Sequence, residues 1–270
     1  MTQQNKLSNI ENKTGNLYSD CFEVLNNDQW IAQGELLADQ LGLDEFWVKS
    51  KRCFDGGCGH GALEYRLAKL GAADVTGFDL HPEIEMDRFK EFLNVRFVQG
   101  SLVDICMPDG LFDLVVSSGV VHHTVDPDKA FSEMTRILKP GGRFVLGVYG
   151  KHGLFPWCLQ MARLFTVRIP MIRESFIRKV CNWLKLDPIW RYQVLDYLYV
   201  PILRRFSPQQ IKDRFFTKNG LLDVERVSNL TPEKAERYVK RNASYTYDYR
   251  KLKSRILFGH GFIVVAGRKP

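Results

Sequence analysis

One short segment, Asp55–Gly61, has the composition of a ligand-binding loop and reads DGGCGHG. Closely spaced glycines let the backbone turn tightly and approach a bound molecule. Asp79 follows about 20 residues after the loop, a spacing at which a carboxylate can accept hydrogen bonds from two neighbouring ribose hydroxyls. The spacing Gly57-x-Gly59-x-x-Ala62 also fits a dinucleotide fingerprint. The loop alone therefore predicts a ligand that contains a nucleoside, without deciding whether it is a dinucleotide.

Two further groups of residues are suited to proton transfer. His122 and His123 are adjacent, and Tyr149 lies three residues before His152. Both pairs follow strand-like segments, and open α/β sheets bind ligands at the carboxyl ends of their strands. A histidine with a pKa near ~6.5 can accept a proton at neutral pH. The alternative is that the adjacent histidines shape their loop and bond to the backbone.

The elements that must position these residues alternate between strand and helix. The pattern predicts strands over 52–55, 74–79, 95–98, 112–117 and 143–148, and helices over 61–70, 83–92 and 127–138. Asp126 is a good N-cap for the last helix, and Pro127 fits its first position. The alternation predicts an α/β, Rossmann-like, doubly wound sheet that is mostly parallel.

Further segments flank this core. We expect one structural domain divided into an N-terminal helical segment (1–50), a ligand-binding core (51–150), a helical lid insertion (151–206) and a completion of the sheet (207–270). The first part contains a helix over 30–41 that Gly42 can end. The lid carries two amphipathic helices over 154–200, separated by Pro170. The last part contains a helix from Ser207-Pro208 to Gly220, strands over 222–227 and 262–266, and a charged helical stretch over 232–241 between those strands.

About residues 51–150 resemble the class I S-adenosylmethionine-dependent methyltransferases of the small-molecule type. The resemblance runs from the Asp55–Gly61 loop through the GFDL segment at 77–80 and the strand exit at 112–123 to the LKPGGR turn at 138–143. It implies a seven-stranded sheet with an antiparallel C-terminal strand pair. It also implies that S-adenosyl-L-methionine is the cofactor and S-adenosyl-L-homocysteine a product. A nicotinamide dehydrogenase becomes the minor alternative.

The resemblance also assigns roles to individual residues. It implies that Asp55 holds the methionine ammonium, Asp79 accepts the ribose hydroxyls and Leu80 packs on the adenine. The other positions that it assigns to the cofactor are Gly57, Cys58, Gly59, Ser101, Leu102, Ser118 and Gly119. Family members often carry Asp where this chain has Ser101, and Asp104 is the other candidate for the adenine amino group.

Apolar runs, the N-terminal residues and the cysteines together predict the cellular compartment. No apolar run approaches the ~20 residues of a membrane span, and the polar start predicts no secretory signal. Six cysteines show no CxxC pair, which predicts free thiols in a reducing compartment rather than disulfides or a zinc site. We therefore expect a cytoplasmic protein without a metal centre.

The expected methyl acceptor is a small molecule, either anionic or hydrophobic, methylated at O, N or C. Residues 1–150 carry a net charge of −8 and residues 151–270 one of +15. An anionic partner would suit the basic half, and Arg163, Arg168 or Arg173 of the aromatic-rich lid could meet it. The alternatives are an RNA substrate for the basic, tyrosine-containing C-terminal part, peripheral contact of the lid with a membrane, and a cofactor-binding regulator without catalysis.

Overall fold

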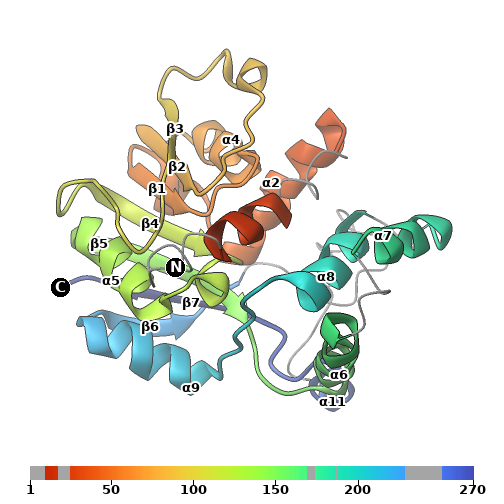
Figure 1. Cartoon of the computed structure of the whole chain (residues 1–270). Helices are drawn as coiled ribbons and strands as arrows, with labels where there is room; N and C mark the ends of the chain where they lie inside the picture. The colour runs from red at the N-terminus through yellow and green to blue at the C-terminus, as the bar shows by residue number, and fades with distance from the viewer. Residues whose placement is uncertain (1–9, 18–24, 169–173, 186–187, 229–250) are drawn as a thin grey trace, which may run out of the picture.

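The computed structural model describes residues 10–17, 25–168, 174–185, 188–228 and 251–270. One sheet organises the chain, in the order β3-β2-β1-β4-β5-β7-β6 (Figure 1). Its strands are β1 (Arg52–Gly56), β2 (Asp74–Asp79), β3 (Val95–Gln99), β4 (Phe112–Ser118), β5 (Leu138–Tyr149), β6 (Leu222–Arg226) and β7 (Phe262–Arg268). The first five strands are parallel, while β7 runs antiparallel to both β5 and β6. This confirms the predicted seven-stranded, doubly wound fold.

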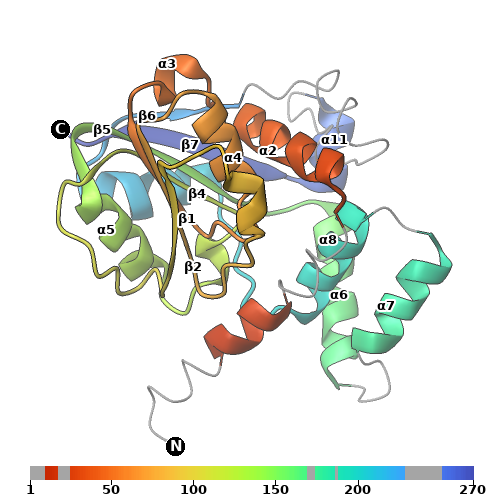
Figure 2. The same ribbon diagram turned by 90° about the horizontal axis from the view of Figure 1, so that it is seen from above.

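Helices cover both faces of the sheet because alternate strand residues point to opposite sides. Cys53 of β1 packs into a core with α2 (Asn27–Leu41) and α4 (Ala62–Lys69). Phe54, the next residue, packs into a second core on the opposite face. That core is covered by α5 (Pro127–Ile137) and α9 (Pro208–Ile211) (Figure 2). Both residues are fully buried, which gives the sheet two apolar layers.

Local signals in the sequence set several helix ends. Gly42 closes α2 in the left-handed conformation, with φ of 66°. The Asp126 side chain accepts a hydrogen bond from the Lys129 amide and begins α5. Ser207 and Gln210 form a reciprocal capping box at the start of α9. These ends confirm the predictions for the three helices, because each depends only on neighbouring residues.

Two helix predictions were wrong. The expected helix over 83–92 is only one 3-10 turn, Met86–Phe89. The segment 83–92 is instead fixed by a hydrogen bond from the Glu83 amide to the Gly59 carbonyl and by burial of Phe89 against α2. The lid has three helices rather than two: α6 (Leu154–Arg168), α7 (Glu174–Trp183) and α8 (Pro188–Tyr199). The charged stretch predicted over 232–241 lies outside the described residues.

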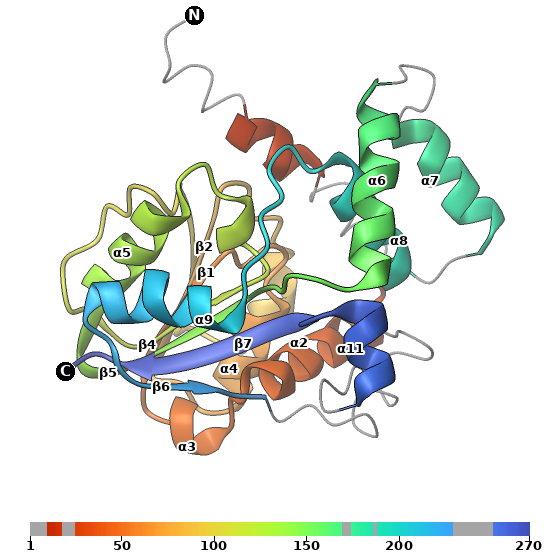
Figure 3. The same cartoon turned by 90° about the horizontal axis from the view of Figure 1, so that it is seen from below.

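The lid lies beyond the carboxyl end of β5 (Figure 3). Its helix α6 packs against α8 and against α11 (Leu252–Phe258), which precedes β7. The helix of residues 10–17, red in Figure 3, lies at the same end of the sheet. Among the described residues, no helix is both long and apolar enough to cross a membrane.

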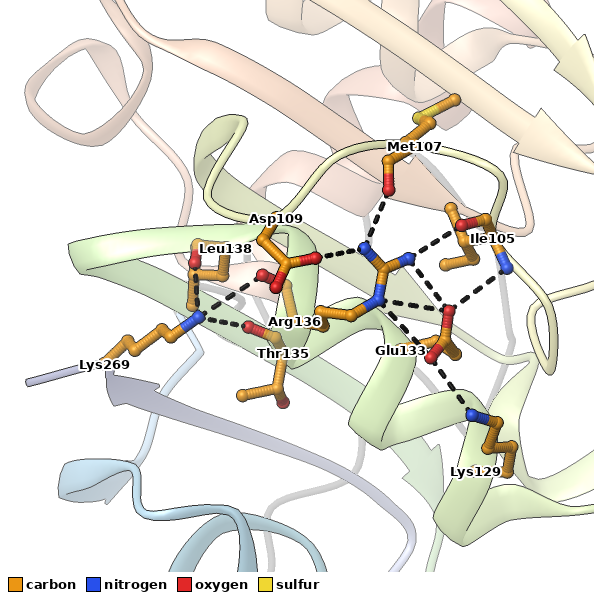
Figure 4. A network of polar contacts seen from close by, with 9 residues as sticks. All are labelled: Ile105, Met107, Asp109, Lys129, Glu133, Thr135, Arg136, Leu138 and Lys269. Atoms are coloured by element: carbon orange, nitrogen blue, oxygen red, sulfur yellow. Dashed lines mark hydrogen bonds and ion pairs between the residues drawn. The ribbon is translucent and has the colours of Figure 1, made fainter.

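The loop that follows β3 is held in place by Arg136, near the end of α5 (Figure 4). The Arg136 guanidinium donates to the main-chain carbonyls of Ile105 and Met107, each at 2.7 Å, and to Asp109 Oδ1 at 2.6 Å. Lys269 donates to the Leu138 carbonyl at 2.7 Å just beyond the same helix. A planar guanidinium with several donors can hold a loop in this way. The strand-end residues that precede the loop are thereby fixed.

Candidate cofactor and acceptor site

The glycine loop turns sharply at the end of β1. Gly57 has φ of 102°, and a Cβ on it would lie 2.0 Å from Cγ2 of Val120. Its amide donates to the Phe78 carbonyl of the neighbouring strand at 2.7 Å. Only glycine combines this conformation with so close an approach. The loop backbone therefore lies directly at the switch between β1 and β4.

Asp79 is fixed by the loop that it faces. One of its carboxylate oxygens accepts the Gly59 amide and the other accepts the His81 amide, both at 3.0 Å. A carboxylate oxygen has two lone pairs, so each oxygen can accept one further hydrogen bond. This geometry suits two adjacent hydroxyl donors. In the parallel pairing of β1 with β2, Asp55 lies opposite Gly77, two residues before Asp79. Asp55 and Asp79 therefore both lie near the carboxyl ends of neighbouring strands.

Asp55 forms a buried acid pair with Glu64 of α4, a residue that the sequence analysis missed. Asp55 is 3% exposed and Glu64 is fully buried. A side-chain hydrogen bond joins the two carboxyl groups, which requires a proton on one of them. Burial raises the pKa of Asp55 to about 7 and, with the nearby Asp55 charge, raises the pKa of Glu64 well above its usual range. The signal available in the sequence was the acidic Glu64 directly after the apolar Leu63 in α4.

The two residues predicted as candidates for binding the adenine amino group, Ser101 and Asp104, differ in burial and in contacts. Ser101 follows β3 and donates its hydroxyl hydrogen to Glu11 Oε1 at 2.8 Å, whereas Asp104 is exposed. Leu102 is 6% exposed and packs in the core beneath Gly56. Ser101 is thus half-buried and held by Glu11, whereas Asp104 faces solvent. Its link to Glu11 was not visible in the sequence.

The remaining cofactor candidates line the two sides of the site. Cys58 is buried, and Leu80 is half-buried at the end of β2, where its carbonyl accepts Gln99 Nε2 at 2.7 Å. Ser118 is half-buried at the end of β4. A Cβ added to Gly119 would meet nothing within 4 Å. The backbone beside Gly119 is therefore open to a ligand.

His122 is the predicted proton-transfer residue that retains its hydrogen-bonding capacity. Its ring is 0% exposed, and neither nitrogen has a hydrogen-bond partner among the described residues. The ring centroid lies 4.3 Å from that of Tyr149. Burial lowers the pKa of His122 well below 6.5, so the imidazole is neutral at physiological pH. A neutral imidazole has one nitrogen that can accept a proton.

His123 is instead held between the sheet and the lid. Its Nδ1 lies 2.7 Å from the Ile202 carbonyl, and its Nε2 lies 3.4 Å from Asp196 Oδ1 of α8. The Tyr149 hydroxyl donates to Asp196 Oδ2 at 2.7 Å. Asp196 is 1% exposed, and the sequence analysis missed it although it is an isolated charge in an apolar stretch of α8. The structure thus brings three of the four predicted residues together, with Asp196 as a fourth member.

His152, the fourth predicted residue, does not join this cluster. It is exposed, has φ of 69°, and its ring lies 5.4 Å from that of His260. It lines an open cavity of about 490 Å³ together with Trp157, Gln160 and Arg205. The Arg205 guanidinium also lies 5.6 Å from the Tyr197 ring, which stacks on Tyr149. His152 therefore belongs to a cavity beside the cluster.

The fold and the strand-end loop define a class I methyltransferase domain. Residues 54–146 match the family model described as "Methyltransferase domain". The glycine loop, Asp79 and the two histidines all lie within the matched residues. The lid and the N-terminal helix lie outside them.

Known methyltransferases align with this domain. The chain is 32% identical over 129 residues to sterol 24-C-methyltransferase erg-4 of Neurospora crassa, an alignment that covers 45% of this chain and 32% of that protein. It is 29% identical over 160 residues to the ubiquinone biosynthesis O-methyltransferase of Xanthomonas oryzae pv. oryzae, covering 53% of this chain and 66% of that protein. The chain thus spans about a third of the fungal relative's length and just under two thirds of the bacterial one's.

A solved structure extends the likeness to the whole chain. The 1,6-didemethyltoxoflavin-N1-methyltransferase of Burkholderia thailandensis superimposes with a TM-score of 0.57 and 14% identity. The superposition covers 100% of this chain and 91% of the other. The additional helices therefore belong to a fold that is shared beyond residues 54–146.

Proposed function

We propose that this protein is an S-adenosylmethionine-dependent methyltransferase that acts on a small molecule. The observation that carries the proposal is the placement of Asp55, the glycine loop and Asp79 at adjoining strand ends. Asp55 is 3% exposed near the carboxyl end of β1, and its buried partner Glu64 is a second acid. A buried pair of acids is costly unless a positively charged group or further donors approach it.

The residues present fit this cofactor. Asp55 would bind its ammonium group, the loop backbone at Gly57 to Gly59 would line its amino-acid part, and Asp79 would accept its ribose hydroxyls. Ser101 would face its nucleobase. When bound, the cofactor supplies a methyl group on a positively charged sulfur, which is open to attack by a nucleophile. The chain's main contribution is to hold that nucleophile within ~3–3.5 Å and aligned.

His122 would receive the proton where the acceptor must lose one. It is neutral and lies beside Tyr149 at the carboxyl end of the central strands. His123, Tyr149 and Asp196 would act differently, because their polar atoms are engaged with one another and with the lid. We assign them to positioning: they hold α8 over the strand ends and keep water from the reacting atoms.

A small acceptor is supported by the lid and by the names of the relatives. Those names specify a sterol, ubiquinone biosynthesis and 1,6-didemethyltoxoflavin, and each indicates a small-molecule acceptor for the named protein. The cavity of about 490 Å³ falls within the usual range of small-molecule sites. Its Arg205 would meet an anionic group, and Trp157 would pack on an apolar body.

Of the three lid arginines proposed from the sequence, Arg163 does not suit an anionic acceptor. It donates to the main-chain carbonyls of Tyr197, Val200 and Pro201, and so joins α6 to the end of α8. The side chains of Arg168 and Arg173 lie outside the described residues. The basic, tyrosine-containing stretch over 238–249 lies outside them as well. A cytoplasmic location stays a prediction.

Methyl-labelled S-adenosylmethionine tests the proposal directly. The protein is incubated with an extract of its source cells, and RNA, protein, lipid and small solutes are then separated. We expect label in the lipid or small-solute fraction, and less of it with the Asp79→Ala variant at the same cofactor concentration. Label in RNA would show that the acceptor class is wrong. Tight cofactor binding without label in any fraction would instead indicate a regulator.

A further inference from the structure

The helix of residues 10–17 folds back onto the candidate cofactor site. Glu11 Oε1 accepts the Ser101 hydroxyl at 2.8 Å, a contact between residues 90 positions apart. In Figure 3 this helix, red and next to the N-terminus, lies at the end of the sheet between the core and the lid. Thr14 and Leu17 of the same helix are 7% and 6% exposed. The helix is therefore packed against the protein along one face.

A second contact joins this helix to the turn after β2. A Cβ added to Gly15 would lie 1.9 Å from Cδ2 of His81, so the helix backbone presses on the His81 ring. The His81 amide donates to the Asp79 carboxylate at 3.0 Å. One helix thus contacts both the turn that holds Asp79 and the loop that carries Ser101. These are the ribose and nucleobase ends of the candidate site.

The bond between Glu11 and Ser101 determines what the pair offers to a ligand. The hydroxyl hydrogen of Ser101 is directed at Glu11, which leaves the Ser101 oxygen as an acceptor. Glu11 is half-buried, and the printed contact engages its Oε1. An ionised carboxylate is acceptor-only. The pair therefore presents acceptors and negative charge, but no donor.

We propose that Glu11 is a specificity residue for the nucleobase of the cofactor. Its carboxylate, held by Ser101, accepts a hydrogen bond from the exocyclic amino group of adenine when the 10–17 helix covers the site. This inference rests on the proposed function. A purine with a carbonyl at that position is rejected, because two acceptors would face each other and leave buried polar atoms unpaired. Discrimination thus comes from a segment outside the matched methyltransferase residues.

Calorimetry with two nucleosides tests this assignment. The ligands are S-adenosylhomocysteine and its analogue with hypoxanthine in place of adenine. We expect the wild type to prefer the adenine compound by at least about tenfold, the usual size of a charged hydrogen bond. Glu11→Gln should lose most of that preference, because the amide can donate to the hypoxanthine carbonyl. Asn12→Ala, at an exposed position of the same helix, is the matched control and should keep it.

A second pair of variants separates charge from helix docking. Ser101→Asp alone places two carboxylates together and should weaken binding of the adenine compound about tenfold. Ser101→Asp combined with Glu11→Gln restores one carboxylate and should restore both affinity and preference. An unchanged preference in Glu11→Gln, or tighter binding of the adenine compound, would overturn the role of Glu11 while leaving the cofactor assignment standing. Failure of the wild type to bind either ligand would instead contradict the proposed function.

Discussion

The hydroxyl of Tyr149, the last residue of β5, donates to the carboxylate of Asp196 in lid helix α8 at 2.7 Å. Asp196 is 1% exposed and also lies 3.4 Å from Nε2 of His123. A buried carboxylate is stable only where donors surround it. The lid is therefore fixed to the sheet by a polar contact beside the candidate acceptor position, and not by apolar packing alone.

Replacing this carboxylate should loosen the lid. Asp196→Ala leaves the Tyr149 hydroxyl and the His123 ring without their buried acceptor, which should cost about 1–3 kcal/mol of the free energy of unfolding. We expect cleavage within residues 151–206 to become faster in limited proteolysis, ahead of cleavage in the core. Asp87→Ala, which alters only an exposed ion pair, is the control. Equal proteolysis of the two variants would mean that the Asp196 carboxylate does not hold the lid.

The turn of the glycine loop should tolerate no side chain. Gly57→Ala and Gly141→Ala both introduce Ala at positive φ, but only at position 57 does the new Cβ meet another atom, Val120 Cγ2. The shared conformational cost is about 1–2 kcal/mol. Urea unfolding should show a larger loss for Gly57→Ala, and Val120→Ala should recover part of the difference. Equal losses at the two positions would contradict the close approach.

The Glu64 carboxyl should make stability depend on pH. Its folded pKa lies above the unfolded value, so the folded state binds the proton more tightly, and this contribution to stability declines as pH rises above about 4.5. Glu64→Gln removes the decline. The stability difference between variant and wild type should therefore grow with pH above 4.5, by up to ~1.4 kcal/mol per pH unit. A difference that stays constant from pH 4.5 to 8 would show that Glu64 is ordinarily ionised in the folded protein.

His122 should affect turnover more than cofactor binding. If it receives a proton from the acceptor, His122→Asn should lower kcat about 10²–10⁴-fold while affinity for S-adenosylhomocysteine changes little. Because its folded pKa lies well below 6.5, kcat at saturating cofactor should not fall through protonation of His122 until the pH is below 6.5. Asp87→Asn, which alters only an exposed ion pair, is the comparison. Similar kcat values for both variants would assign His122 to packing.

The sequence predicted what depends on neighbouring residues and missed what depends on distant ones. The mostly parallel, doubly wound sheet was predictable because alternating strands and helices admit few topologies. The cap at Asp126 and the stop at Gly42 are local signals, and both were found. Asp196 lies 47 residues from Tyr149 in the chain, and no sequence period connects them. The contact of Glu11 with Ser101 spans 90 residues and was missed for the same reason.

The false helix over 83–92 has a physical cause as well. Its apolar residues Ile84, Phe89 and Phe92 pack against one core, but without forming a continuous helix. Phe89 packs on Trp30, and both Phe89 and Ile84 lie near Gly61 at the end of the glycine loop. Tertiary contacts thus override a weak local preference, as they often do in short segments.

Calorimetric binding of S-adenosylhomocysteine to the wild type, Asp79→Ala and Asp104→Ala tests the central claim most directly. Asp79 is held by two loop amides at the end of β2, whereas Asp104 is exposed beyond β3. We predict that the wild type and Asp104→Ala bind alike and that Asp79→Ala binds at least about tenfold more weakly, since a charged acceptor is lost. Equal affinity of Asp79→Ala and the wild type would contradict the cofactor site described for this fold.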